Sequence, residues 1–302
     1  MKGVYLILSS SFLFSVMGLL AKFRGKEVSS WDNVFYRSFF AVVVLTPLFI
    51  YDKFIAKKIS EKGGKKFFLI SRGLSGTFSL FLFFYLIQNH SLGLAVISVQ
   101  TSPIYLTLFE ILKKSEKPDL KTILSIVVGF IGILFTFQIS AEHFFDFGIA
   151  GILCGISTAY SYNSLREMRG IYNPRTIVLS FCILGSAVPF VLKFFQLGSW
   201  YSKLGSPSIS LPRSETDFVL ILSIGLFAML GQIFLTKGYV YLPASEASAL
   251  GYSYVVFALV LEFFFGNHVP NKFQILGTIL IVLSGIIIAI KRRNTKKILS
   301  EN

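Results

Sequence analysis

Two arginines lie inside long apolar stretches of this sequence, which makes them the first candidates for chemistry. Arg37 follows Phe35 and Tyr36 in one stretch, and Arg72 precedes Gly73 near the start of another. An ionisable group at the centre of a bilayer costs about 2.5–3.5 kcal/mol on insertion scales. A guanidinium that faces an internal cavity can repay this cost by holding an anionic group such as a carboxylate. The alternative is that both arginines reach the membrane interface or pair with helix ends.

Two glutamates occupy matched positions in the two halves of the chain. Glu110 and Glu262 are 152 residues apart, and each is followed by seven residues and then a proline. Partly desolvated carboxylates can act as gates or exchange protons, so the pair is a candidate for gating or coupling. The alternatives are ordinary solvation at the membrane interface and, for Glu110, pairing with Lys113 or Lys114.

A polar and aromatic set lies near the middle of several apolar stretches. Its members are Gln100, Thr101, Ser102 and Tyr105 around Pro103, then Tyr160, Tyr162 and Asn163, then Gln232, and then Tyr252, Ser253 and Tyr254. Hydrogen-bonding groups mixed with ring faces are typical of small-molecule cavities, although such groups also bond between packed helices. We expect a substrate-binding site made of Arg37, Arg72, Gln100, Tyr105, Tyr160, Asn163, Gln232, Tyr252 and Tyr254.

The elements that position these residues follow from composition and apolar length. The chain has 302 residues, of which 54% are hydrophobic and 15% charged, whereas soluble domains contain about 25% charged residues. Ten apolar runs approach the roughly 20 residues needed to cross a bilayer: 3–21, 33–51, 67–88, 91–112, 120–138, 147–165, 176–195, 217–236, 245–266 and 272–290. Backbone groups in lipid must bond within their own segment, so we expect an all-α integral membrane protein with ten transmembrane helices.

The distribution of basic residues predicts the orientation of these helices. With the N-terminus in the cytoplasm, the inside segments hold 20 of the 29 lysines and arginines and the outside segments hold seven. The positive-inside rule therefore places both termini in the cytoplasm. The net charge of +14 is then explained by loops that face anionic lipid, without nucleic acid. Trp31 and Trp200 fall at the predicted outer interface.

The two halves of the chain share a pattern. A shift of 152 residues places Pro118 on Pro270 and Gly73 on Gly225. Each half has five runs, and because five is odd the second half enters the membrane from the opposite side, as in inverted-repeat transporters. We expect a first repeat over 1–140, a second over 145–292 and a cytoplasmic tail over 293–302.

Several short motifs recur in a fixed order along the chain. They are Phe35-Tyr36-Arg37-Ser38-Phe39-Phe40, Arg72-Gly73-Leu74, Pro103, Glu116-Lys117-Pro118, Tyr252-Ser253-Tyr254, Phe265-Gly266, Pro270, Gly277 and Gly285. In these motifs the sequence resembles the EamA-type, ten-helix branch of the drug/metabolite transporter superfamily, near the S-adenosylmethionine and riboflavin carriers. That branch often has an arginine where Ser253 stands. The resemblance implies alternating access around a cavity lined mainly by runs 1, 3, 4, 6, 8 and 9.

Other classes of protein lack their sequence signatures here. The chain contains no Gly-x4-Gly-Lys-Ser/Thr, no His-Glu-x-x-His and no Gly-x-Ser-x-Gly. We expect neither a cofactor nor a bound metal ion. The predicted function is secondary transport of a small polar metabolite, an amino acid or an S-adenosylmethionine-like compound, across the cytoplasmic membrane. The alternatives are a membrane enzyme and a channel. Proton or ion coupling is possible, and the protein is expected to be a monomer or homodimer.

The glutamate hypothesis yields a direct test. If Glu110 and Glu262 act in gating or coupling, the charge-neutral variants Glu110→Gln and Glu262→Gln lose substrate transport, because glutamine neither binds nor releases a proton. Uptake by each variant would be measured across a range of pH. Uptake equal to wild type at every pH would end the hypothesis for that residue.

Overall fold

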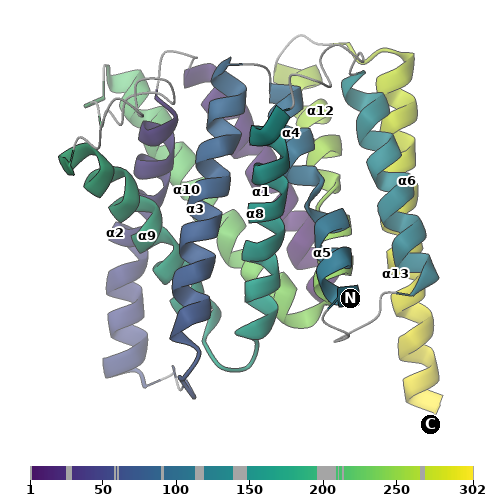
Figure 1. Cartoon of the computed structure of the whole chain (residues 1–302), viewed down its shortest axis with the longest axis horizontal. Helices are drawn as coiled ribbons and strands as arrows, with labels where there is room; N and C mark the ends of the chain where they lie inside the picture. The colour runs from purple at the N-terminus through teal and green to yellow at the C-terminus, as the bar shows by residue number, and fades with distance from the viewer. Residues whose placement is uncertain are drawn as a thin grey trace.

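The chain forms a bundle of helices that run across a common layer (Figure 1). The computed structural model describes residues 2–24, 29–57, 59, 61–89, 92–112, 119–138, 148–195, 209, 211–212, 214–265 and 269–301. The helices are α1 (Lys2–Arg24), α2 (Ser30–Ile50), α3 (Lys66–Asn89), α4 (Leu92–Gln100), α5 (Ser102–Leu112), α6 (Leu120–Phe137), α8 (Gly148–Glu167), α9 (Pro174–Phe195), α10 (Glu215–Tyr241), α11 (Ala244–Leu250), α12 (Ser253–Phe265) and α13 (Lys272–Glu301). A short π-helical segment, η1 (Tyr51–Ile55), continues α2.

These helices confirm the all-α membrane fold. Among the described residues, six helical segments are long and apolar enough to cross a membrane: Lys2–Arg24, Ser30–Ile55, Lys66–Ile87, Pro174–Phe194, Glu215–Tyr241 and Ala244–Phe265. Shorter apolar segments cover Ala95–Phe109, Leu120–Thr136 and Lys272–Ile287. The remaining predicted run corresponds to α8, which has 20 residues and is less apolar. Each predicted run therefore has a helical counterpart.

The structure adds detail to three of the predicted segments. Runs 91–112 and 245–266 are each divided into two shorter helices. The apolar part of the last helix covers Lys272–Ile287, close to the predicted run 272–290, and the helix continues to Glu301. Trp31, predicted at the outer interface, is buried, and its ring stacks on that of Phe81 with centroids 4.0 Å apart. Trp200 lies outside the described residues.

The packing of the helices follows the inverted relation between the two halves. Helix α1 packs on α10 as α8 packs on α3, and α1 packs on α12 as α8 packs on α5. The pairs α2–α10 and α9–α3 are related in the same way. The pairs α2–α9 and α6–α13 each join counterpart helices from the two halves. Two five-helix units of opposite orientation produce these reciprocal contacts.

Glycines allow several of these helices to approach closely. A Cβ atom on Gly277 of α13 would clash with the carbonyl oxygen of Gly132 on α6 and with Thr136. At the α1–α10 contact, a Cβ on Gly238 would meet the side chain of Ile7. Small residues at such contacts let backbones pack closely where lipid offers no hydrophobic driving force.

The α6–α13 contact yields a matched pair of predictions on one helix. Gly277→Ala lowers the free energy of unfolding by about 1–3 kcal/mol, because its methyl group forces two backbones apart. Gly285→Ala raises it by up to about 1 kcal/mol, because the nearest neighbouring atom to its Cβ would lie 4.0 Å away. Thermal unfolding of both purified variants measures the difference. Equal melting temperatures for the two variants would contradict the described contact.

Candidate functional site

Two helix breaks meet near the centre of the bundle. The first lies at Thr101, between α4 and α5, and the second lies at Gly251 and Tyr252, between α11 and α12. Pro103 explains the first break, since proline has no N–H and its ring clashes with the carbonyl four residues earlier. Gly251, with Ser248 three residues before it and Ser253 two residues after it, accounts for the second, because glycine and serine are common where helices kink.

Local hydrogen bonds satisfy part of the backbone at each break. The Thr101 hydroxyl donates to the Ser98 carbonyl at 2.6 Å, and the Ser253 hydroxyl donates to the Leu250 carbonyl at 2.8 Å. The Gly251 N–H reaches the carbonyls of both Ala247 and Ser248. Freed backbone groups at membrane depth are tolerated where side chains bond them or where they line a cavity.

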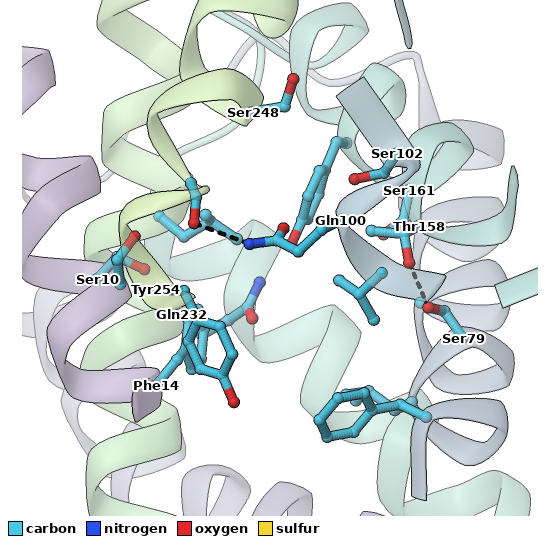
Figure 2. A pocket seen from close by; sticks show the side chains of 18 of the residues that line it. Ser10, Phe14, Ser79, Gln100, Ser102, Thr158, Ser161, Gln232, Ser248 and Tyr254 are labelled. Atoms are coloured by element: carbon cyan, nitrogen blue, oxygen red, sulfur yellow. Dashed lines mark hydrogen bonds between the residues drawn. The ribbon is translucent and has the colours of Figure 1, made fainter. Parts of the chain in front are cut away.

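Gln100 connects the two breaks directly. Its side-chain Nε2 donates a hydrogen bond to the carbonyl oxygen of Gly251 at 3.1 Å, as the dashed line in Figure 2 shows. The Gly251 carbonyl also accepts from the Tyr254 N–H at 3.0 Å, so the Gln100 side chain adds a second hydrogen bond at this break. This bond joins the first half of the chain to the second at the level of the cavity.

A cavity of about 150 Å³ lies beside this bond. Its lining combines hydroxyl and amide groups with aromatic rings, a mix typical of small-molecule sites. The residues that line it include Ser10, Ser11, Phe14, Arg37, Ser79, Gln100, Ser102, Thr158, Ser161, Tyr162, Phe181, Gln232, Tyr239, Ser248 and Tyr254. They come from α1, α2, α3, α4, α5, α8, α9, α10, α11 and α12, so all spans except α6 and α13 take part. Figure 2 shows the amide of Gln232 and the ring of Tyr254 on the side opposite Ser79 and Thr158.

Arg37 gives this cavity a positive charge. Its side chain is buried, and its guanidinium carbon lies 5.9 Å from the ring centroid of Phe14. No hydrogen bond or ion pair joins Arg37 to another residue of the described ranges, and no Asp or Glu is among the described residues that line the cavity. Gln232 likewise makes no hydrogen bond to the described part of the chain. Both groups therefore have hydrogen-bonding capacity available for a ligand or water.

Arg72 is buried nearby but does not line the cavity. It donates from Nη1 to the Ile177 carbonyl at 3.2 Å, and its guanidinium lies 5.0 Å from the ring centroid of Phe181. Its Nε has no partner in the described structure. Phe181 does line the cavity, so Arg72 sits behind a lining residue. Arg72 therefore adds positive charge behind the wall of the cavity but does not contact the cavity itself.

The structure brings together only part of the predicted site. Four of the nine predicted substrate-binding residues line the cavity: Arg37, Gln100, Gln232 and Tyr254. The other five, Arg72, Tyr105, Tyr160, Asn163 and Tyr252, do not. Tyr252 is fully buried and packs where a Cβ on Gly129 of α6 would stand. Tyr105 packs beside Gly155 of α8.

Several lining residues were missed when the sequence was considered alone. Ser10 and Phe14 on α1 are four residues apart, and Thr158 and Ser161 on α8 are three apart. That spacing places each pair on one helix face. Ser79 and Thr158 join α3 to α8 through hydroxyls 2.5 Å apart. The sequence signal that could have identified these lining residues is the helical spacing of small polar residues within apolar runs.

Charged pairs close the bundle at the end where α1 finishes. Lys22 pairs with Glu262 at 2.8 Å, and Arg24 pairs with Asp217 at 2.7 Å while also donating to Asn33. These contacts join α1 to α12, α10 and α2. The Glu262 carboxylate is thus in an ion pair, whereas the side chain of Glu110 lies outside what the structure describes.

At the opposite end, charged contacts connect a different set of helices. Asp52 in η1 pairs with Arg175 of α9, and Lys65 pairs with Glu167 of α8 at 3.4 Å. Glu61 accepts from the Thr176 hydroxyl at 2.5 Å. In the described ranges no three His, Cys, Asp or Glu side chains gather in a metal-binding arrangement, and the three histidines lie outside those ranges.

A helical membrane bundle with a central cavity, whose mainly apolar lining carries a few hydroxyl, amide and guanidinium groups, defines the class of this protein. The chain belongs to the EamA-like transporter family, which matches residues 1–138 and 146–290. Family and relatives are transporters rather than enzymes.

Three relatives illustrate the range of this family. An uncharacterized transporter of Helicobacter pylori is 31% identical over 95% of this chain and 94% of its own length. The pseudopaline exporter CntI of Pseudomonas aeruginosa is 26% identical over 94% of each. The S-adenosylmethionine uptake transporter of Rickettsia conorii is 24% identical over 93% of this chain and 90% of its own. Similarity thus extends to proteins named for opposite directions of transport.

The two ion pairs at the α1 end differ in exposure and should differ in strength. The side chains of Arg24 and Asp217 are 3% and 13% exposed, against 54% and 23% for Lys22 and Glu262. Asp217→Asn therefore lowers the free energy of unfolding by about 3–5 kcal/mol, because it leaves a buried cation without its partner. Glu262→Gln lowers it by less than about 1 kcal/mol. Thermal unfolding of both variants checks this order, and a reversed order would refute it.

Proposed function

We propose that this protein is a secondary transporter for a small polar metabolite that carries a carboxylate, such as an amino acid or an S-adenosylmethionine-like compound. The observation that carries the proposal is the buried Arg37 guanidinium, which has no hydrogen-bond or ion-pair partner among the described residues, in a cavity whose described lining contains no Asp or Glu. A bound carboxylate would supply the counter-charge, and Gln232 and Tyr254 would bond or stack against the rest of the solute.

The small size of the cavity favours a compact substrate. Its volume of about 150 Å³ is below the roughly 300–1,000 Å³ of typical ligand pockets. An amino-acid-sized solute thus requires less rearrangement than a nucleoside-sized one. In this proposal the two repeats, 1–140 and 145–292, surround the site, and their relative movement produces alternating access. The Lys22–Glu262 ion pair belongs to one gate. Glu110, at the corresponding position of the first repeat, belongs to the other gate.

We also propose the cytoplasmic membrane as the location, with both termini in the cytoplasm. The excess of lysine and arginine in the segments on that side supports this orientation. In Figure 1 the C-terminal end of α13 extends well below its neighbour α6, and the mark for the N-terminus lies in the lower half of the bundle. If transport is coupled to protons or another ion, Glu110 and Glu262 are the residues that we propose for this coupling.

Counterflow in proteoliposomes tests transport and its substrate together. A thermal-shift screen of free amino acids, their amides and S-adenosylmethionine would first identify a ligand, because binding to the folded state raises stability. The carboxylate form is expected to bind and to show saturable uptake and counterflow. Linear flux without counterflow would indicate a channel, and a chemically altered solute an enzyme.

Arg37 variants separate recognition from folding. Arg37→Gln weakens binding of the carboxylate ligand by about 10- to 150-fold, as expected for losing a hydrogen bond to a charged group. Its melting temperature stays equal or rises, because an unpaired buried charge is removed. Arg37→Lys retains the charge but loses the bidentate geometry, so it gives an intermediate affinity. Unchanged affinity in Arg37→Gln, or equal binding of acid and amide, would refute the carboxylate assignment.

A further inference from the structure

A second hollow lies on the outside of the bundle, away from the central cavity. It has a volume of about 540 Å³ and lies between the start of α1, the end of α10 and Pro174 at the start of α9. We call it the α1–α10 groove. The residues that line it are Lys2, Tyr5, Leu6, Ser9, Pro174, Phe234, Lys237, Val240 and Tyr241.

Helix geometry shows that this groove faces away from the cavity. On α10, Gln232 and Leu235 line the cavity, whereas Phe234 and Lys237 line the groove. An offset of two residues corresponds to about 200° around a helix, so the two sets point in opposite directions. On α1 the two sets are less sharply separated, because Leu6 lines the groove and Ser10, one turn later, lines the cavity. Tyr5 and Tyr241 are largely exposed, so the groove lies at the outer surface of the described bundle.

The chemistry of the groove changes along its length. Lys2 and Lys237 line it together with Tyr5 and Tyr241, and the two tyrosines are 64% and 52% exposed. Neither lysine makes an ion pair or hydrogen bond with any residue that the structure describes, and no Asp or Glu is among the described lining residues. Phe234 provides an apolar continuation deeper along α10.

We infer that the α1–α10 groove binds an anionic phospholipid. The lipid phosphate would lie between Lys2 and Lys237 at the ends of the two helices, and an acyl chain would cover the apolar part near Leu6 and Phe234. Basic pockets between transmembrane helices bind anionic head groups, and tyrosine is favoured at the head-group level. The combination of two cations without a carboxylate and an adjoining apolar surface matches a charged lipid rather than a soluble anion.

Binding there would connect two helices that also line the cavity. Helices α1 and α10 already pack closely, and the Ser10 hydroxyl of α1 donates to the Gly231 carbonyl of α10 at 2.8 Å. A phosphate held by one lysine from each helix adds a second connection on the outer face. The bound lipid would therefore stabilise the α1–α10 pair in the folded protein. This inference does not require that the cavity transports a solute.

Lipid retention and thermal stability of the full-length protein test the inference. Native mass spectrometry of wild type from mixed micelles should show a preference for phosphatidylglycerol over phosphatidylcholine of up to about 30-fold, since each basic side chain contributes roughly a fivefold factor. Phosphatidylglycerol should also raise the melting temperature of wild type by at least about 2 °C relative to phosphatidylcholine. The double variant Lys2→Gln and Lys237→Gln should lose both effects.

A charge-matched variant and a soluble anion serve as controls. Lys66→Gln with Lys121→Gln removes two exposed lysines elsewhere and should keep both effects. Inorganic phosphate at the same concentration should not raise the melting temperature. The inference fails if wild type shows no lipid preference, if the groove variant responds like wild type, if the control loses the response equally, or if phosphate alone reproduces the shift. The wild-type retention measurement decides the matter even if the groove variant does not fold.

Discussion

The structure depends on satisfying backbone polar groups in a place where water is scarce. Lipid offers no hydrogen-bond partners, so a transmembrane helix can be interrupted only where other protein groups or a cavity take over. Here two interruptions, at Thr101 and at Gly251, lie close enough for Gln100 to bond the carbonyl of Gly251. The central cavity lies beside this irregular backbone. Hydrogen bonds made at the breaks offset part of the cost of interrupting two helices.

The inverted relation between the halves explains why the breaks meet. Each repeat contributes one interrupted span, and because the repeats have opposite orientation the two interruptions come to a similar depth. The reciprocal helix contacts extend this relation through the bundle. The side chains do not follow it closely, since Gln100 in one half corresponds to Tyr252 in the other by the 152-residue shift, and Tyr252 is buried away from the cavity. The arrangement of the helices is thus symmetric between the two halves, whereas the side chains that line the cavity are not.

The fold could be predicted from sequence because runs of about 20 apolar residues indicate membrane helices. The runs matched the helices, but their lengths did not show where two spans are interrupted or that α13 continues to Glu301. The site was harder because an apolar transmembrane helix shows little difference between its faces, so spacing does not reveal which side points inward. Arg72 illustrates this: it is buried like Arg37, but its guanidinium bonds to Ile177 behind Phe181. Serines such as Ser10 were overlooked because small hydroxyl groups are also ordinary helix-packing residues.

The unbroken course of α13 has a practical consequence for imaging. The helix continues to Glu301 and extends past the end of α6 in Figure 1, while its apolar part packs against α6 through Gly277 and Gly132. Neither α6 nor α13 contributes a described residue to the cavity lining. A helical fusion partner joined in register to this end would therefore continue α13, and it would enlarge the particle for electron cryomicroscopy without touching the cavity.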